Sequence, residues 1–345
     1  MGDIKAYNTN MIDDVRSKLA TLPQGSRVRC ALSDQEIEKI SRAVESERIE
    51  DLRGRSYPPL FVLVHKLDVS QINDLDSDIE LVLSRTKPRD AGPLLLKQLL
   101  EDRKYRAGIF EIYAKSQLLK ADETSVELDS PLPNGCNADM RLSLGGREFY
   151  LECTILSESN EDRKRLEELI EAKKSNPSAS QSWMGSFLYD AIRLYYKVYD
   201  KLARNWNPKK SQLSDAHPSV LVISLFVGNG SVSAESPGTR FALETLFSES
   251  LGNPEEEQSQ PPENASLRGW LHDACIHGRN PLTENEYKTR YLDLLSSRKK
   301  ISGILLFQDC ELKESRVNYS ANHRITHGEM ARLEELFASS PRWWP

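Results

Sequence analysis

The chain has 345 residues, of which 39% are hydrophobic and 28% charged, a composition typical of a folded globular protein rather than a fibrous or disordered one. Its longest apolar runs are far shorter than the ~20 residues that a membrane-spanning helix requires, so we expect no membrane partner. The formal net charge of −6 argues against nucleic-acid binding over the whole surface, although it leaves room for one local basic groove.

The first hundred residues are predicted to be mainly helical. Ser33 and Glu36 have the spacing of a capping box. The apolar residues after them recur at helical spacing, which predicts a helix that reaches about Arg48. The apolar run at 60–67 fits either a strand or a short buried helix, because periodicity cannot decide between the two over so few residues.

The middle third of the chain is predicted to follow the order α-β-β-β-α-β. The expected elements are a helix at 102–120, strands at 125–128, 138–144 and 147–156, helical segments at 158–174 and 183–205, and a strand at 219–227. The last of these is a continuous Val/Leu/Ile/Phe run, typical of a strand buried on both faces. Together these elements favour an α/β fold with a mixed sheet.

The remaining elements are arranged around this core. A Pro- and Glu-rich stretch predicts an exposed loop at 252–265. Two further strands and a closing helix are expected at 301–308, 315–319 and 327–337, and we expect the strands to extend the middle sheet. We therefore divide the chain into a mainly helical N-terminal region (1–100), a core (101–230) and an α+β C-terminal extension (231–345) packed on the core sheet.

One hairpin of the core brings two acids together. Gly145 and Gly146 lie between two alternating runs, and this dipeptide supplies the positive φ angles of a two-residue hairpin turn. Counting residues away from the turn along both strands places Asp139 directly opposite Glu152. Because side chains alternate between the two faces of a strand, the two carboxylates share one face and the apolar residues share the other.

This pair of acids predicts a metal site. Directly opposed residues have Cβ atoms ~4.5–5.5 Å apart, and like charges there destabilise a sheet unless something compensates. A divalent cation would compensate, since two carboxylates, water and a backbone carbonyl such as that of Cys153 suit Mg²⁺ or Mn²⁺. The alternative is a solvent-exposed face on which Arg141 serves as the counter-ion of the two acids.

A third carboxylate is expected on the helix at 102–120. Glu111 shares a helix face with Ala114 and Leu118, so it would point from a packed face toward the same site. The alternative is an ordinary surface glutamate that pairs with Lys115 at i+4.

Residues 102–228 resemble the PD-(D/E)xK nuclease superfamily, the restriction-endonuclease-like fold. The tripeptide Asn-Ala-Asp that ends at Asp139 stands in the place of the family's Pro-Asp, and the tripeptide Glu-Cys-Thr that begins at Glu152 stands in the place of its (D/E)-x-K. The chain departs from the family pattern at Thr154, which replaces the lysine. Family members use that ammonium to orient water or to stabilise phosphate charge.

The following amphipathic helix offers a replacement for that lysine. Its basic residues at helical spacing form a stripe of Arg193, Lys197, Lys201 and Arg204. Lys197 and Lys201 are the candidates for the missing cation, and the whole stripe is a candidate contact for a phosphate backbone. The alternative is a helix that buries its tyrosines and exposes its charges.

The resemblance implies a nuclease that depends on Mg²⁺ or Mn²⁺ and hydrolyses phosphodiester bonds through a metal-activated water, with DNA favoured over RNA. Asp139 and Glu152 would bind the metal, with Glu111 assisting. Thr154 would hold the attacking water by a hydrogen bond. The replacement lysine would neutralise charge in the transition state.

The competing hypothesis is a catalytically inactive protein that keeps this scaffold as a nucleic-acid-binding or protein-interaction module. Thr154 and the acidic net charge favour it. Under either hypothesis, the N-terminal helical region is a candidate contact for a protein partner or for a second copy of the chain. Five scattered cysteines and the absence of a secretory signal favour the reducing cytoplasm.

Overall fold

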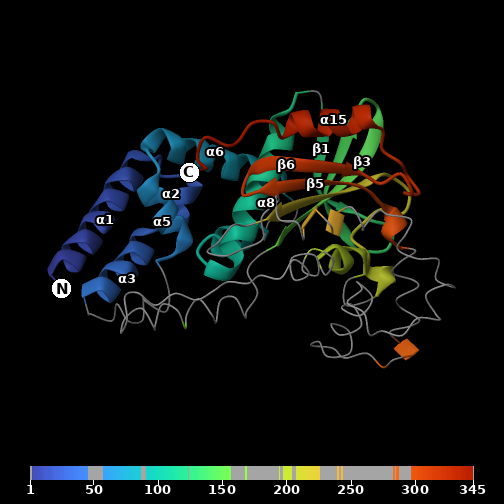
Figure 1. The fold of residues 1–345 in the computed structure, drawn as a ribbon. Coiled ribbons are helices and arrows are strands. Elements are labelled where there is room, and N and C mark those ends of the chain that lie inside the picture. Colours follow the sequence, from blue (N-terminus) through green and yellow to red (C-terminus); the bar gives the residue numbers. More distant parts are fainter. Residues whose placement is uncertain are drawn as a thin grey trace. The chain divides into compact units, whose positions relative to one another are not determined.

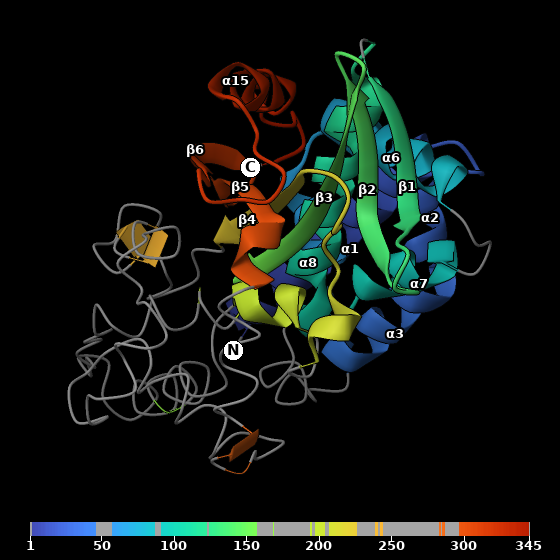
Figure 2. The ribbon, with the colours of Figure 1, turned by 90° about the vertical axis from the view of Figure 1, so that its right-hand side faces the viewer.

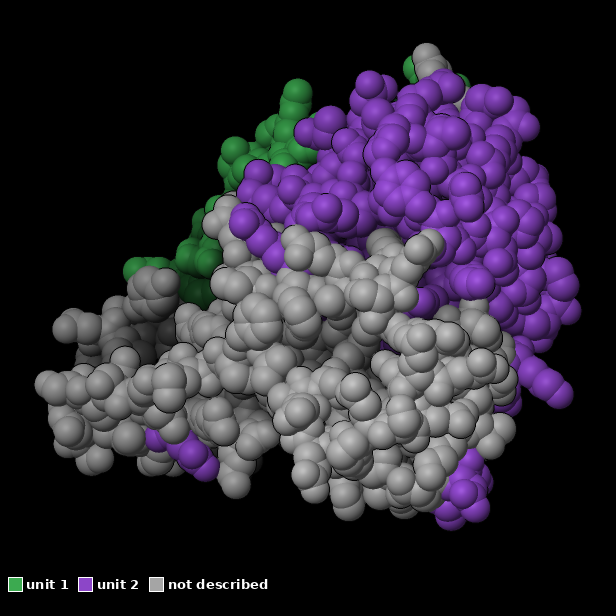
Figure 3. All heavy atoms as spheres, turned by 45° about the vertical axis from the view of Figure 1, so that its right-hand side comes forward, with its two compact units in different colours: residues 1–122, 339–345 green, residues 123–338 purple. Residues whose placement is uncertain are grey.

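The computed structural model describes residues 2–45, 57–86, 91–122, 124–156, 207–225 and 297–344, together with 168, 194, 197–203, 239–240, 242–243, 283 and 285–286. The chain forms two compact units (Figure 3). Unit 1 comprises residues 1–122 and 339–345, and unit 2 comprises residues 123–338. The helix at 102–120, which the sequence analysis grouped with the core, clusters with unit 1.

Unit 1 is helical (Figure 1). Its described helices are α1 (Gly2–Thr21), α2 (Arg27–Ala31), α3 (Asp34–Glu45), α5 (Pro59–Lys66), α6 (Val69–Arg85), α7 (Ala91–Gln98) and α8 (Asp102–Lys120). The predicted helix after Ser33 is confirmed as α3. The apolar run at 60–67 proves to be the helix α5, which Pro59 opens at a position where a missing N–H is tolerated.

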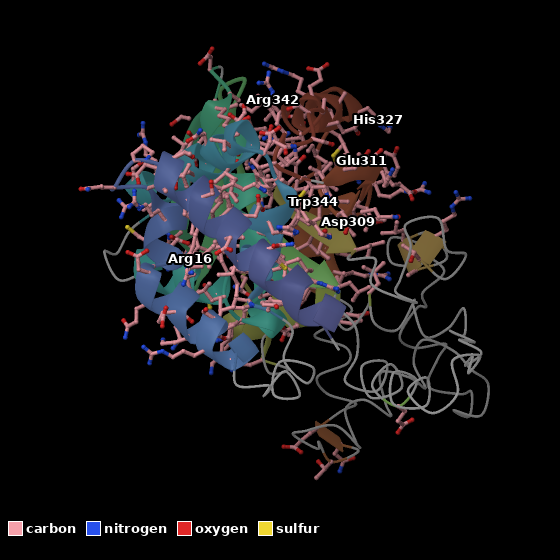
Figure 4. The ribbon with its side chains drawn as sticks, turned by 90° about the vertical axis from the view of Figure 1, so that its left-hand side faces the viewer. Arg16, Asp309, Glu311, His327, Arg342 and Trp344 are labelled. Carbon is pink, nitrogen blue, oxygen red and sulfur yellow. The ribbon has the colours of Figure 1, made fainter. Side chains whose placement is uncertain are left out.

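The C-terminal residues of the chain pack in unit 1. Trp343 is only 1% exposed, and its indole N–H donates to Asp78 Oδ2 at 2.8 Å. Asp78 is also paired with Lys120, and the Gln71 side chain donates to the backbone carbonyl of Arg342 at 2.9 Å. Figure 4 labels Arg342 and Trp344, the residues before and after Trp343 in the chain. The contacts of Trp343 and Arg342 fasten the end of the chain to α6.

Unit 2 is built on a mixed sheet whose strands lie side by side in chain order (Figure 2). Within the described residues the six strands are β1 (Ser125–Pro131), β2 (Asn137–Leu144), β3 (Arg147–Leu156), β4 (Ser219–Leu225), β5 (Ile301–Gln308) and β6 (Glu311–Val317). The β1–β2, β2–β3 and β5–β6 pairs are antiparallel, and the β3–β4 and β4–β5 pairs are parallel. The other elements of unit 2 whose bounds lie in the described residues are the short 3-10 turns η2 (Pro208–Lys210) and η3 (Arg298–Lys300) and the helix α15 (His327–Leu336).

The prediction of an α/β fold with a mixed sheet is confirmed. The parallel strands β4 and β5 are buried along almost their whole length, as their unbroken apolar runs indicated. β6 begins earlier than predicted, at Glu311 (Figure 4), because Asp309 has a φ of 57° and lets the chain turn at once. The predicted helical segments at 158–174 and 183–205 and the loop at 252–265 fall largely outside the described residues.

The β2–β3 hairpin has the predicted turn and register. Gly145 and Gly146 have φ values of 60° and 80°, which is the left-handed pair that a tight two-residue turn requires. The ladder runs from the turn to the pair formed by Met140 and Leu151. One face of the hairpin is buried and apolar, with Met140, Leu142, Leu144, Phe149 and Leu151. The ladder stops one step before the two acids.

No helix in the described part of the chain combines the length and apolar character that crossing a membrane would require.

Candidate acid–lysine site

Asp139 and Glu152 lie at the open end of the β2–β3 hairpin. Here hydrogen bonds from the backbone to side-chain carboxylates replace the backbone hydrogen bonds of the ladder. Glu152 Oε2 accepts a hydrogen bond from the backbone N–H of Asp139 at 3.1 Å. Asp139 Oδ2 accepts one from the backbone N–H of Cys153 at 2.7 Å. Each carboxylate therefore binds the main chain of the opposite strand, and the two acids are held next to each other as the register predicted.

Lys201 joins the two acids. Its Nζ lies 2.5 Å from Glu152 Oε1, and the two side chains are 14% and 1% exposed. The backbone of Lys201 is also fixed, because its carbonyl accepts a hydrogen bond from the Gln212 N–H at 2.9 Å. We call Asp139, Glu152 and Lys201 the acid–lysine cluster. With every group ionised, it carries one positive and two negative charges.

Burial and charge oppose each other in this cluster. Burial raises the pKa of Glu152, the neighbouring charge of Asp139 raises it further, and Lys201 offsets only part of this, so the pKa is about 8. Burial alone would lower the pKa of Lys201, but the charges of the two acids outweigh it and raise that pKa to about 12. Lys201 therefore stays a cation at neutral pH, while Glu152 stays near its titration point.

Arg141 is not the counter-ion of the acid pair. Its guanidinium lies 2.8 Å from Glu127 Oε2 and 3.5 Å from Glu148 Oε1. Glu152 is fully buried, so the alternative of a solvent-exposed face neutralised by Arg141 is wrong. The physical reason is that a side chain from outside the hairpin covers this end and brings its own ammonium, which alternation along two strands cannot reveal.

Of the two candidates for the replacement lysine, Lys201 is the one bonded to Glu152. Lys197 lies one helical turn earlier and is half-buried. On the same stretch Tyr199 and Leu202 are buried while Asp200 is exposed. The alternative for the basic stripe was a helix that buries its tyrosines and exposes its charges. Tyr199 is buried as that alternative predicts, but Lys201 is not exposed. Arg193 and Arg204 lie outside the described residues.

Thr154 lies two residues after Glu152 on β3, where it pairs with Ile223 of β4. Residues two apart along a strand share a face. The side chain is half-buried, and among the described residues it has no hydrogen-bond partner. The position two residues after Glu152 therefore carries a short hydroxyl.

Glu111 lies on α8 and bonds to Lys115, with 2.6 Å between Oε1 and Nζ. Lys115 is 3% exposed and Glu111 33% exposed. This is the i+4 pair that the sequence analysis gave as the alternative. Because Glu111 belongs to unit 1 and the acid–lysine cluster to unit 2, its assistance to the cluster stays a prediction.

The donor set of the cluster fits one divalent cation. Each carboxylate offers about four acceptor positions, and Asp139 Oδ1 makes no hydrogen bond to a described residue. Mg²⁺ keeps several waters and needs only one or two carboxylates. In the parts of the chain that the structure describes, no group of three or more His, Cys, Asp or Glu side chains is placed to bind a metal. The two acids would therefore have to suffice.

One feature of the site was missed by the sequence analysis. The backbone N–H groups of Asp139 and Cys153 anchor the two carboxylates. No residue pattern signals such anchors, because every residue except proline carries the same backbone donor. The one indication of these anchors was that the two acids lie at the end of the hairpin away from the turn.

Comparison of the chain with protein-family models, with curated proteins and with solved structures finds no match.

Proposed function

We propose that this protein is a divalent-metal-dependent nuclease of the PD-(D/E)xK type, with DNA as its preferred nucleic acid. The observation that carries the proposal is the acid–lysine cluster, in which two neighbouring carboxylates and a buried ammonium meet at the end of a hairpin. The order of elements supports it as well. A three-stranded meander followed, after a long connection, by a further strand is the arrangement that the resemblance implies.

Asp139 and Glu152 are the residues that would hold the metal. A bound Mg²⁺ or Mn²⁺ ion supplies positive charge beside the scissile phosphate and lowers the pKa of water. When both carboxylates are ionised they outnumber the single ammonium of Lys201, and this excess of negative charge favours a cation there.

Lys201 takes the role of the missing motif lysine. With a pKa of about 12 it is cationic at neutral pH. A buried ammonium stabilises the charge that develops on a phosphate more strongly than one in water, because the surrounding dielectric constant is lower. The hydrogen bond at its carbonyl holds the backbone of Lys201 in place, which limits the reorganisation needed during the reaction.

Thr154 holds the attacking water in this proposal. Its hydroxyl can both donate and accept a hydrogen bond, and it makes no hydrogen bond to a described residue. A hydroxyl at this position orients a water without adding charge. The charge that a lysine would bring here is supplied by Lys201, so the two roles of the family's motif lysine are divided between two side chains.

A binding module without catalysis is the second candidate function. The bond between Lys201 and Glu152 favours it, because the ammonium already neutralises one of the two acids. Such a protein would bind nucleic acid without any requirement for a divalent ion. The replacement of the motif lysine by Thr154 points in the same direction.

The test is cleavage of plasmid DNA and of labelled oligonucleotides by the full chain in Mn²⁺ and in Mg²⁺. We expect Asp139→Asn to lower the rate at least ~100-fold, the loss typical when one group that stabilises the transition state is removed. Glu148→Gln is the matched control, since Glu148 is an exposed acid of the same hairpin, and it should cleave like the wild type. Binding without cleavage, unaffected by metal or by Asp139→Asn, would instead support the binding module.

A further inference from the structure

The segment from Asn207 to His217, which joins the helical stretch of Lys201 to β4, is held firmly by side chains. The Asn207 carboxamide oxygen accepts from the Lys209 N–H at 3.0 Å and closes the first turn. The Ser211 carbonyl accepts from the Asn134 side chain at 2.7 Å. The Ser214 N–H donates to Ser219 Oγ at 2.9 Å. The backbone of this segment is therefore fixed before any ligand arrives.

The far end of the same segment is tied to the turn before β5 and to the connection between β6 and α15. His323 Nε2 lies 2.8 Å from the carbonyl of Asp215, and Lys300 Nζ lies 2.8 Å from its carboxylate. A segment that is held along its length in this way loses little conformational entropy on binding, which strengthens any contact that it makes.

Two adjacent lysines of this segment are exposed. Lys209 and Lys210 occupy the short turn η2, and Ser211 after them is buried. Neither lysine has an ion-pair partner among the described residues, whereas several other cations of unit 2 do. Those paired cations are Arg141, Arg147, Lys300, Lys313 and Arg316.

The two lysines lie near the acid–lysine cluster. The Gln212 N–H donates to the carbonyl of Lys201 at 2.9 Å, and Lys209 is three residues before Gln212. Three residues span at most ~11 Å. The hydrogen bond and the length of Lys201 from its carbonyl to its ammonium add to this span. Each strand of a duplex carries one phosphate per ~3.4 Å along the helix axis, so a strand whose scissile bond lies at the cluster has further phosphates that these lysines reach within several nucleotides.

We propose that Lys209 and Lys210 form a second phosphate-binding site, which holds the nucleic-acid backbone a few nucleotides from the bond at the acid–lysine cluster. The inference rests on the proposed function and adds to it the direction in which the strand leaves the cluster, along the 207–217 segment. Exposed ammonium groups contact phosphates without reading sequence, so this site contributes affinity and register rather than sequence specificity.

The test measures binding of labelled duplex and single-stranded DNA by fluorescence anisotropy over a series of salt concentrations, without divalent metal so that cleavage does not interfere. Each phosphate contact contributes ~0.9 to the slope of log affinity against log salt for a duplex. We expect Lys209→Ala with Lys210→Ala to reduce that slope by about 2 and to weaken binding at low salt at least ~10-fold.

Two controls accompany the double variant. Lys313→Ala with Arg316→Ala removes the same charge from β6, two strands beyond β4 in the sheet, and should bind like the wild type. Lys209→Arg with Lys210→Arg keeps both charges and should also bind like the wild type. A wild-type slope in the double alanine variant, or an equal loss in the β6 variant, would overturn the second phosphate site while leaving the proposed function standing. A wild-type protein that binds neither form of DNA would overturn both.

Discussion

The two ends of the β2–β3 hairpin each carry an acid paired with a base, but the pairs have opposite electrostatic character. At the turn end, Arg147 Nη1 contacts both carboxylate oxygens of Glu329 at 2.8 and 3.0 Å, and the arginine is 39% exposed. At the open end, the pair of Lys201 and Glu152 is almost completely buried. Both contacts are short, so distance does not distinguish a structural clamp from a candidate catalytic cluster.

The difference appears in the pKa of the acid. At Glu329, burial acts to raise the pKa, but the Thr326 backbone N–H and the Arg147 guanidinium outweigh it and hold the pKa below its usual range. At Glu152, burial and the charge of Asp139 prevail over Lys201. The comparison teaches that exclusion of water, together with a second acid, decides whether the pKa of the paired acid falls or rises.

The largest expected effect comes from breaking each pair on its own. Lys201→Met leaves a buried acid without its partner and should lower the free energy of unfolding by ~3–5 kcal/mol. Arg147→Met breaks a partly exposed pair and should cost about 1 kcal/mol or less. Urea unfolding of the metal-free proteins measures both.

The double variant Glu152→Gln with Lys201→Met sharpens this comparison, because it removes both charges and should recover much of the loss caused by Lys201→Met. Equal losses for Lys201→Met and Arg147→Met would show that the buried pair does not differ from the exposed one in the way that we infer.

The second prediction concerns pH. The folded-state pKa of Glu152 is raised to about 8, so its ionisation opposes folding. The metal-free wild type should therefore lose stability relative to Glu152→Gln as the pH rises from about 4.5 to about 8, by at least ~2 kcal/mol at ~1.4 kcal/mol per pKa unit. Glu329 has the opposite sign, since its pKa is lowered. Its contribution is present above the unfolded pKa and is lost as the pH falls through the folded pKa.

Urea midpoints of the wild type, Glu152→Gln and Glu329→Gln across this pH range test both signs. The Glu329→Gln curve should approach that of the wild type in acid, whereas the Glu152→Gln curve should separate from it toward alkaline pH. Parallel curves for the wild type and Glu152→Gln would contradict the assignment of Glu152 as a buried, charge-strained acid.

The smallest effect is expected at the turn. Gly146 has a φ of 80° and open space around the position that a Cβ would occupy, so Gly146→Ala should cost only the conformational strain of ~1–2 kcal/mol. Gly328→Ala is the matched control in the same unit, because Gly328 lies in α15 with equally open surroundings. It should be neutral or stabilise by up to ~1 kcal/mol. Thermal unfolding distinguishes the two, and equal effects would show that the turn does not require the left-handed conformation.

The parts of the fold that depend on local sequence could be predicted. The strands of the core and the helix after Ser33 follow from periodicity and capping. The choice between helix and strand at 60–67 did not, because a largely apolar run of eight residues fits either until its neighbours are known. Arg141 was a candidate counter-ion because it lies on the same hairpin face as the acids. Only the packed structure shows that it pairs with Glu127 and Glu148 instead.

The sequence by itself determined that Asp139 and Glu152 would meet, because a two-residue turn and the alternation of side chains set the register over a short stretch of chain. Only the tertiary structure decided that Lys201, 49 residues beyond Glu152, would reach that acid and that the pair would be buried. Local backbone geometry acts over a few residues, whereas burial and its effect on pKa depend on which distant segment covers the site, and that choice is made by the packing of the whole unit.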